Sequence, residues 1–452
     1  MTAENKKVLI VGAGLCGSLL GCYLVKRGYE VEMYEKRNDL RLTTEERGRS
    51  INLALSSRGI RALEGAGIGQ ILKNICIPMY SRAIHVPGSD IGLFPYSGRQ
   101  GEYINSISRS QLNEVLLDSF DQSGGRHVHF RAACTNINFE SHLAYFDELD
   151  KGTITQVKYD YLFGTDGAAS AVRHALYKRP IMSYSYQQDF LNYGYKELIL
   201  PAGSGNSFQI EKNALHIWPR GHFMMIALPN LDGSFTVTLF LPLHGSDSFD
   251  EIDSNIGIEA YFEKYFKDIQ PLFDDLEEQY AVNPIGMLGT IKCQPWTDGK
   301  NAIILGDAAH AIVPFYGQGM NAAFEDVRVL GDLLDDCGQM DDAFFNRLQS
   351  ERRINTDAIA DLAIDNFYEM RDRTGDLIFQ AKRRLETRLE KNFPDYYSKY
   401  SLVTFRNDVP YHEAMVTGRK QDEWLMDYCA MHPEPGDSEL KDIYNLLKAE
   451  II

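Results

Sequence analysis

The residues best suited to chemistry lie near the N-terminus, where a glycine-rich turn follows an apolar run. Val8–Val11 leads directly into Gly12-Ala13-Gly14-Leu15-Cys16-Gly17, and Glu35 follows a second strand-like run. In such a turn Gly12 permits the tight bend, Gly14 lets the backbone approach a pyrophosphate, and Gly17 lets a helix pack against the strand. Glu35 stands where a carboxylate can bind a ribose hydroxyl. The pattern predicts a dinucleotide site at a helix N-terminus.

The same stretch has a second interpretation, because residues 8–25 carry no charge and follow Lys6 and Lys7. An uncharged stretch after basic residues is also typical of a signal peptide or a membrane span. However, glycines dilute the apolar character, and residues 29–34 alternate like a strand before Glu35. Residues 18–27 are expected to form a helix that Gly28 ends. The order of strand, turn, helix, strand and acid favours the nucleotide site.

The composition is that of an ordinary globular protein. The 452 residues, 44% hydrophobic and 24% charged, suffice for two or three domains. A net charge of −17 disfavours nucleic acid or an anionic membrane as the main partner. The 7 cysteines are scattered without a C-x-x-C pair, which disfavours a disulfide framework or a zinc site. We therefore expect a cytoplasmic protein with no metal site, no nucleic-acid partner and no membrane span.

Later segments predict an antiparallel sheet, a further strand of the parallel type and a helical region. Strand-like runs at 214–218, 223–228 and 235–241, the last two joined by a turn at Asp232-Gly233, predict an antiparallel sheet. Residues 301–305 return as a buried strand of the parallel type. From Asp376 onward the sequence is helical, with a break at Pro394. A chain that leaves one layer, builds a separate sheet and comes back implies an inserted domain.

Two further loops follow predicted strands. Asp166-Gly167 follows a strand at 159–163, and an Asp-Gly pair in that position is usually only a turn. Gly306 and Asp307 end the strand at 301–305, where a carboxylate points into the crevice that binds ligands in such sheets. A glycine-rich stretch then precedes a helix predicted at 322–334, whose N-terminus favours an anion. An ordinary helix cap explains the same glycines.

Taken in this order, the motifs resemble the single-component FAD-dependent aromatic hydroxylases, the class typified by para-hydroxybenzoate hydroxylase. A narrower resemblance, to the kynurenine 3-monooxygenase family, extends over nearly the whole chain to about Ala414. The segments that carry it are 50–56, 77–79, 84–85, 216–220, 223–230, 306–325 and 355–362.

The resemblance implies an α/β fold with a Rossmann-like FAD-binding domain, an inserted antiparallel-sheet substrate domain and a C-terminal helical region. The FAD-binding domain is expected at 1–75, 100–179 and 286–375, the substrate domain at 76–99 and 180–285, and the helical region at 376–452. Eukaryotic members end in a membrane-anchoring helix that this sequence lacks, so we expect a bacterial-type enzyme.

The resemblance also implies a reaction. NADPH would reduce FAD, O₂ would form a flavin C4a-hydroperoxide, and L-kynurenine would be hydroxylated at ring position 3 to 3-hydroxykynurenine, a step of tryptophan catabolism and NAD biosynthesis. NADPH is expected to dock transiently, since no second strand–GxGxxG–helix unit is present. No catalytic acid or base is assigned, because the amino group of the substrate activates its ring. A homodimer is left open. Two alternatives are a related hydroxylase of another amino- or hydroxy-aromatic acid, and a flavin-binding module without oxygenation.

The site residues beyond the glycine turn depend on the resemblance. By the family pattern the cofactor is bound by Gly12, Gly14, Leu15, Cys16, Gly17, Tyr34, Glu35, Lys36, Arg37, Ala54, Arg109, Asp166, Gly306, Asp307, Gly319, Met320 and Asn321. The substrate carboxylate is assigned to Arg82 and Tyr96, with Asn366 and Tyr400 as further polar anchors. The ring is assigned to Leu215, Met224, Ile226, Leu228, Phe240 and Tyr316, the last of which is phenylalanine or histidine in relatives. Core packing explains an apolar strand face equally well, and a solvated surface charge explains Arg82.

Overall fold

The computed structural model describes residues 6–42, 52–125, 127–179, 183–373, 376–433 and 436–451. The chain forms two compact units, each assembled from three separate segments. Unit 1 comprises Met1–Ile75, Ser108–Asp189 and Gly289–Ala360, and unit 2 comprises Cys76–Ile107, Phe190–Leu288 and Asp361–Ile452. The C-terminal helices therefore group with the antiparallel sheet in unit 2. The stretch 43–51, which includes the start of the motif at 50–56, lies outside the described residues.

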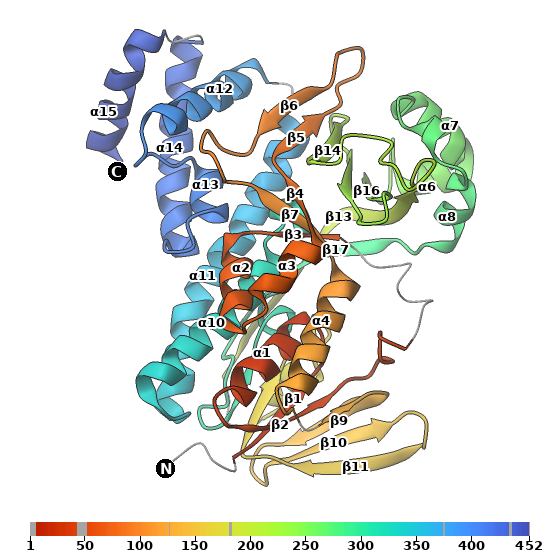
Figure 1. Cartoon of the computed structure of the whole chain (residues 1–452), viewed down its shortest axis with the longest axis vertical. Helices are drawn as coiled ribbons and strands as arrows, with labels where there is room; N and C mark the ends of the chain where they lie inside the picture. The colour runs from red at the N-terminus through yellow and green to blue at the C-terminus, as the bar shows by residue number, and fades with distance from the viewer. Residues whose placement is uncertain are drawn as a thin grey trace. The chain divides into compact units, whose positions relative to one another are not determined.

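Unit 1 is built on a five-stranded parallel sheet with the strand order β18-β12-β1-β2-β8. Figure 1 labels β1 and β2 of this sheet. Its strands are apolar because both faces of such a sheet are covered. The predicted strands at 8–11, 29–34, 159–163 and 301–305 are confirmed as β1 (Lys7–Val11), β2 (Glu30–Tyr34), β12 (Tyr161–Gly164) and β18 (Ala302–Ile304).

The helix after the glycine turn, α1 (Leu15–Val25), contacts α4 (Arg109–Gln122) and α10 (Gly319–Cys337) as well as the sheet. This burial explains the uncharged stretch at 8–25 as a buried strand followed by a buried helix. In the part of the chain that the structure describes, no helix combines the length and apolarity that a bilayer crossing needs. Both α1 and α10 begin three residues earlier than predicted, and neither start has a capping side chain that would mark it in the sequence.

The remaining elements of unit 1 cover or extend the sheet. An antiparallel sheet has the order β11-β10-β9. The elements are β3 (Asn52–Leu55), α2 (Ser57–Gly65), α3 (Gly69–Ile75), β8 (His127–His129), β9 (Ala132–Asn138), β10 (Leu143–Glu148), β11 (Thr153–Lys158), α5 (Ala171–Tyr177), α9 (Asp307–His310) and a 3₁₀ turn η4 (Pro314–Tyr316). A long helix, α11 (Asp342–Tyr368), runs from unit 1 into unit 2.

Unit 2 contains the predicted antiparallel sheet. The strand order is β17-β13-β16-β15-β14-β5-β6. β14 and β5 pair in parallel, whereas the pairs β13–β16, β16–β15, β15–β14 and β5–β6 are antiparallel. The strands are β5 (Ser81–Ile84), β6 (Gly92–Pro95), β13 (Ser185–Leu200), β14 (Ala214–Pro219), β15 (Met224–Pro229), β16 (Phe235–Pro242) and β17 (Gly286–Gln294). Two shorter strands, β4 (Cys76–Met79) and β7 (Ile104–Ser108), pair with each other. The predicted hairpin is confirmed, and Gly233 occupies its turn at a φ of +91°.

One face of this sheet carries the core of the unit. Trp218, Met225 and Val237 on the strands pack with Tyr261 and Phe262 on the covering helices. The covering elements are α6 (Phe249–Glu251), η2 (Ile252–Ile256), α7 (Ile258–Tyr265), η3 (Gln270–Leu272) and α8 (Leu276–Val282). The opposite face carries further buried apolar residues.

The predicted helical C-terminus is confirmed. It contains η5 (Glu369–Arg373), α12 (Leu377–Asn392), α13 (Lys399–Thr404), α14 (Tyr411–Met431), η6 (Asp437–Glu439) and α15 (Leu440–Glu450). A second apolar cluster, which includes Leu385, Leu425 and Leu447, holds α12, α14 and α15 together. The short helix α13 matters most for the site, because it carries Tyr400.

Candidate functional site

The glycine turn after β1 has the geometry that its sequence predicts. Gly12 has a φ of +97°, and a Cβ there would lie 2.6 Å from the carbonyl oxygen of Thr165. A Cβ on Gly17 would come within 2.0 Å of the Gly12 carbonyl oxygen, so both positions require glycine. Gly14 differs, because the nearest described atom to its Cβ would be Nη2 of Arg37 at 3.6 Å. The protein packing alone therefore does not require glycine at position 14, whereas the close approach of a pyrophosphate would require it.

The same turn leads into a helix end suited to an anion. Gly14 is the N-cap of α1, no side chain caps this end, and its first turn holds no acidic residue. The N–H groups and the dipole of such a helix end attract a phosphate group. The first two helical residues, Leu15 and Cys16, are only half-buried. The residues at this turn therefore fit the diphosphate of a dinucleotide.

Glu35 lies directly after β2 and next to the glycine turn. Its carboxylate accepts hydrogen bonds from the backbone N–H of Ala13 at 2.9 Å and from the Arg37 Nε at 2.9 Å. Burial alone would raise the pKa of Glu35, but the hydrogen bonds and charge of Arg37 outweigh it and hold that pKa below its usual value. The carboxylate is thus ionised at neutral pH and can accept from a ribose hydroxyl. Lys36 and Arg37 are exposed beside it.

Tyr34 contributes differently from its neighbour. Its ring is buried and stacks on His129 and Phe146, with centroid distances of 4.3 and 4.0 Å. Its carbonyl oxygen accepts from the backbone N–H of Gly12 at 2.8 Å. Tyr34 therefore supports the glycine turn through its backbone, and a cofactor contact by its side chain stays a prediction.

Gly306 and Asp307 lie at the same edge of the parallel sheet as the glycine turn, since the carboxyl ends of parallel strands share one edge. Gly306 has a φ of +59°, and its Cβ would lie 3.1 Å from Sγ of Cys16 and 3.3 Å from Cβ of Ala323. This close approach joins the end of β18 to the first turns of α1 and α10. Asp307 is exposed although the residues on both sides of it are buried. Its carboxylate is available for a polar cofactor group.

The second glycine loop ends in an uncapped helix as well. α10 begins at Gly319 without a side-chain cap and without an acidic residue in its first turn. The side-chain amide of Asn321 accepts from the Ser56 backbone N–H at 3.0 Å and donates to the carbonyls of Ala54 and Gly317, each at 2.9 Å. Asn321 thus joins this loop to the end of β3. The half-buried Ala54, Gly319 and Met320 surround the junction.

Two predicted cofactor residues lie at helix starts. Arg109 is the first residue of α4 and is exposed, so its guanidinium is accessible. Asp166 accepts from the Ser170 hydroxyl at 2.5 Å and from the Ala171 backbone N–H at 2.7 Å, which fastens it to the start of α5. Burial raises the pKa of Asp166 above its usual value. A cofactor contact by its carboxylate stays a prediction.

In unit 2, strand register brings most of the predicted ring-lining residues to one face of the sheet. Arg82 pairs with Leu215, Ile217 with Ile226, and Met224 with Phe240. Paired residues point to the same side, and every second residue of a strand does so too. The face opposite the core therefore holds Arg82, Leu215, Met224, Ile226, Leu228 and Phe240 together.

Arg82 is placed among aromatic rings. Its guanidinium carbon lies 4.5 Å from the ring centroid of Tyr96 and 4.2 Å from that of Tyr400. The two tyrosine rings stack with centroids 5.6 Å apart. Within the described residues, the guanidinium has no ion pair or hydrogen bond. Arg82 is half-buried rather than a solvated surface charge.

The Tyr96 hydroxyl is the second unusual feature of this group. Tyr96 is 5% exposed, and its Oη is buried without a hydrogen-bond partner among the residues that the structure describes. Such an atom is costly unless a ligand satisfies it. Burial, with Tyr400 nearby, raises the pKa of Tyr96 well above its ordinary value, so the phenol remains a donor. A cation and a buried donor side by side can bind a carboxylate.

Two other substrate assignments remain predictions. Asn366, on α11, donates from Nδ2 to Sδ of Met370 at 3.3 Å. Tyr316 is buried on η4 in unit 1, whereas the other substrate residues belong to unit 2.

The sequence did not reveal one buried charge network in unit 1. Oδ2 of Asp326 accepts from Nε2 of His310 at 2.6 Å and from the Gly306 backbone N–H at 3.0 Å, while Oδ1 accepts from Nε of Arg352 at 2.7 Å. Burial alone would raise the pKa of Asp326, but His310 and Arg352 outweigh it and hold it below its usual value. Asp326 thereby fixes the backbone at Gly306. In the sequence, the adjacent acidic residues Glu325 and Asp326 within the largely apolar segment 322–334 are the signal that could have indicated this network.

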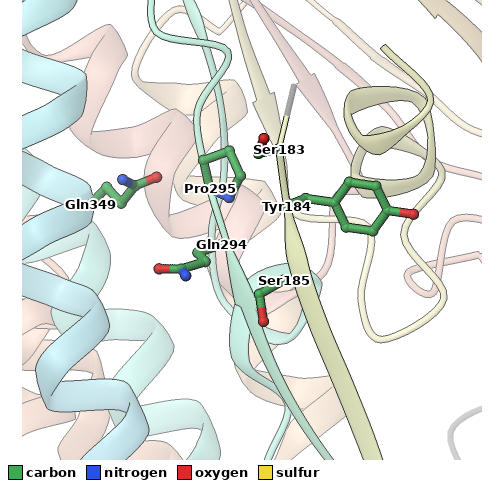
Figure 2. Close-up of a pocket in the computed structure, with 6 residues that line it drawn as sticks. All are labelled: Ser183, Tyr184, Ser185, Gln294, Pro295 and Gln349. Atoms are coloured by element: carbon green, nitrogen blue, oxygen red, sulfur yellow. The ribbon is translucent and has the colours of Figure 1, made fainter. Parts of the chain in front are cut away.

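A shallow polar pocket of about 310 Å³ lies elsewhere in unit 1 (Figure 2). It is lined by Ser183, Tyr184, Ser185, Gln294, Pro295 and Gln349. No predicted site residue is among them, so we assign neither cofactor nor substrate to this pocket. In the described ranges, no cluster of histidine, cysteine and acidic side chains could hold a metal ion.

Comparison with known proteins agrees with this geometry. The family described as "FAD binding domain" matches residues 5–240 and 262–362. A kynurenine 3-monooxygenase of Myxococcus xanthus is 43% identical over 452 residues, covering 99% of this chain and 96% of the relative. That of Dictyostelium discoideum is 39% identical and covers 99% and 96%. The chain is a FAD-binding enzyme that belongs to the kynurenine 3-monooxygenase family of FAD-dependent monooxygenases.

Solved structures support the fold. A tetrameric form of 2-methyl-3-hydroxypyridine-5-carboxylic acid oxygenase has a TM-score of 0.67 at 17% identity, covering 92% of this chain and 98% of that one. HpxO of Klebsiella pneumoniae, complexed with FAD and uric acid, has a TM-score of 0.63 at 17% identity, covering 84% and 92%. The predicted fold class of a FAD-binding aromatic hydroxylase is thus confirmed.

Proposed function

We propose that this enzyme hydroxylates L-kynurenine at ring position 3 to give 3-hydroxykynurenine, with FAD as cofactor, O₂ as oxidant and NADPH as reductant. The names of the relatives support the substrate, and the FAD-binding family supports the cofactor. The reaction would place the enzyme in tryptophan catabolism.

One observation carries the substrate assignment. L-Kynurenine is an amino acid with an aniline ring, so its site needs a cation for the carboxylate and an apolar wall for the ring. The guanidinium of Arg82 contacts two tyrosine rings and, in the described ranges, no carboxylate. The buried Tyr96 hydroxyl, which has no partner there, lies on a ring that this guanidinium contacts. A substrate carboxylate would satisfy both groups.

The sheet supplies the apolar wall that the ring needs. Met224, Leu228 and Phe240 share the face of Arg82 and are 3%, 6% and 3% exposed. Helices of the same unit cover the opposite face, so these buried side chains form a second apolar surface. We infer that the aniline ring lies along it, with the carboxylate held at the Arg82 end.

FAD, when bound and reduced, supplies the oxygen chemistry, and the protein supplies position and electrostatics. The residues that would hold it are those of the parallel-sheet edge. The turn at Gly14 and the end of α1 would bind the diphosphate, Glu35 the ribose, and Asp307 a hydroxyl of the ribityl chain.

The test is a turnover assay with product analysis. The purified protein should be yellow, should oxidise NADPH faster when L-kynurenine is added, and should release 3-hydroxykynurenine that carries oxygen from labelled O₂. Stimulation by another aromatic acid alone would show that the substrate differs. Stable flavin binding without turnover would indicate a binding module, and a protein colourless after reconstitution with FAD would refute the cofactor assignment.

A further inference from the structure

Two histidines and an aspartate form a hydrogen-bonded chain behind the strand that carries Arg82. His85 follows β5 directly, and His216 lies on β14, the parallel neighbour of β5. Nε2 of His85 lies 2.9 Å from Nδ1 of His216, and Nδ1 of His85 lies 3.1 Å from Oδ2 of Asp268. At the other end, Nε2 of His216 lies 2.8 Å from the Glu211 carbonyl oxygen. Both imidazoles are buried, so each contact replaces water.

The two ends of the chain fix two of its ring hydrogens. The Glu211 carbonyl can only accept, so Nε2 of His216 carries a hydrogen. The carboxylate of Asp268 can also only accept, so Nδ1 of His85 carries a hydrogen too. One further hydrogen lies between the two rings. Burial lowers the pKa of His216 to about 4, which favours the neutral form of this ring at pH 7.

An aromatic ring and a further charged side chain also contact His85 and Asp268. Trp218 donates to Oδ2 of Asp268 at 2.7 Å and stacks on His85 at 4.0 Å. Arg220 donates to the His85 carbonyl at 2.7 Å and lies 4.0 Å from Asp268. The charged groups that face the histidines are thus Asp268, Arg220 and the more distant Glu211 carboxylate.

The hydrogen bonds of the two histidines help to hold β5, the strand that carries Arg82, in its register. β5 has four residues and pairs with β14 on one side and with the edge strand β6 on the other. Ala83 pairs with His216, and the His85 N–H donates to the Ile217 carbonyl at 2.9 Å. Because side chains alternate, the histidine chain fastens the end of β5 on the face opposite Arg82.

We infer that His85 and His216 are positioning residues for Arg82, which hold β5 in register so that the guanidinium stays beside Tyr96 and Tyr400. The inference rests on the proposed function, in which Arg82 binds the carboxylate of L-kynurenine. It predicts that binding weakens in acid. Protonation of His216, whose pKa burial lowers to about 4, would change the hydrogen bond between the two imidazoles.

The test measures the Kd for L-kynurenine by calorimetry between pH 4 and 8, together with kcat and KM. His85→Leu removes the chain and should raise the Kd about 10- to 100-fold, the cost of a displaced anchor, with KM affected more than kcat. His85→Gln can still donate to His216, so it should restore part of the affinity. Asp268→Asn weakens the hydrogen bond at the other end of the chain and should raise the Kd less than His85→Leu does.

His244→Gln is the matched control, because His244 lies in the same unit with 70% of its side chain exposed. It should leave the Kd and its pH profile unchanged. Asp268 is 47% exposed, so Asp268→Asn keeps the test open even where His85→Leu fails to fold. A wild-type protein that binds L-kynurenine, with a Kd that neither His85→Leu nor Asp268→Asn raises, would overturn this inference alone. A wild-type protein that does not bind L-kynurenine would refute the proposed function as well.

Discussion

Tyr96→Phe is the most informative single change, because it removes one oxygen atom and leaves the ring beside Arg82 in place. In the free protein this oxygen is buried and has no partner among the described residues. An unsatisfied buried hydroxyl costs about 1–3 kcal/mol, so its removal should stabilise the free protein by an amount of that order. With a carboxylate bound, the same hydroxyl would donate a charge-assisted hydrogen bond of about 1.5–3 kcal/mol.

The substitution should therefore act in opposite directions on stability and on binding. Loss of about 1.5–3 kcal/mol corresponds to a Kd for L-kynurenine that rises about 10- to 100-fold. The assay pairs thermal unfolding of the free protein with calorimetric titration of L-kynurenine at one pH. Tyr396→Phe is the matched control, because the Tyr396 hydroxyl is likewise buried without a described partner in unit 2 but lies outside the predicted site. It should stabilise the protein and leave the Kd unchanged.

Two different outcomes of the Tyr96→Phe experiment would contradict a role of this hydroxyl in carboxylate binding. If Tyr96→Phe lowers the unfolding temperature, the hydroxyl has a structural partner and the free site is already satisfied. If the free protein is stabilised but the Kd changes less than about twofold, the hydroxyl does not touch the ligand. Either result would remove Tyr96 from the carboxylate site and leave Arg82 without its supporting donor.

Three further changes test the other parts of the molecule. Arg82→Ala should raise the Kd for L-kynurenine at least about tenfold with the flavin content unchanged. Arg82→Lys should recover only part of this affinity, because lysine lacks the planar guanidinium fork. An unchanged affinity in calorimetry would exclude Arg82 from the substrate site. Gly14→Val should abolish flavin binding, measured as the visible absorbance per protein, because its side chain fills the space meant for the pyrophosphate; a fully yellow variant would contradict this. The ion pairs that lower the pKa of Asp326 against the effect of burial stabilise the fold above the unfolded carboxyl pKa of about 4 and are lost as the pH falls through the folded value. Asp326→Asn should therefore unfold at a lower temperature than the wild type at pH 7, with the difference shrinking in acid; a pH-independent difference would refute the assignment.

Much of the fold could be predicted because its determinants are neighbours along the chain. The apolar run at β1, the glycine turn and the alternation in β2 are each a local pattern, and a local pattern constrains the backbone directly. The same holds for the hairpin of β15 and β16 with its turn at Gly233. Helix starts were less predictable, since a helix without a capping side chain leaves no mark at its first residue.

The candidate site likewise contains residues whose proximity follows from local spacing and residues that only the fold brings together. The positions of Gly12, Gly14, Gly17 and Glu35 follow from spacing, because one short loop brings them together. By contrast, nothing near Arg82 in the sequence indicates that a tyrosine on the distant helix α13 contacts its guanidinium.

Local patterns in the sequence predict a parallel sheet with a glycine turn suited to phosphate, followed by an inserted antiparallel sheet. Packing of the distant segments then buries the Tyr96 hydroxyl without a described partner and lets Asp326 fix the backbone at Gly306. Packing also joins His85 and His216 by one hydrogen bond. Dihedral preferences act between chain neighbours, whereas burial and the pairing of distant polar groups arise only when the packed chain removes these groups from water.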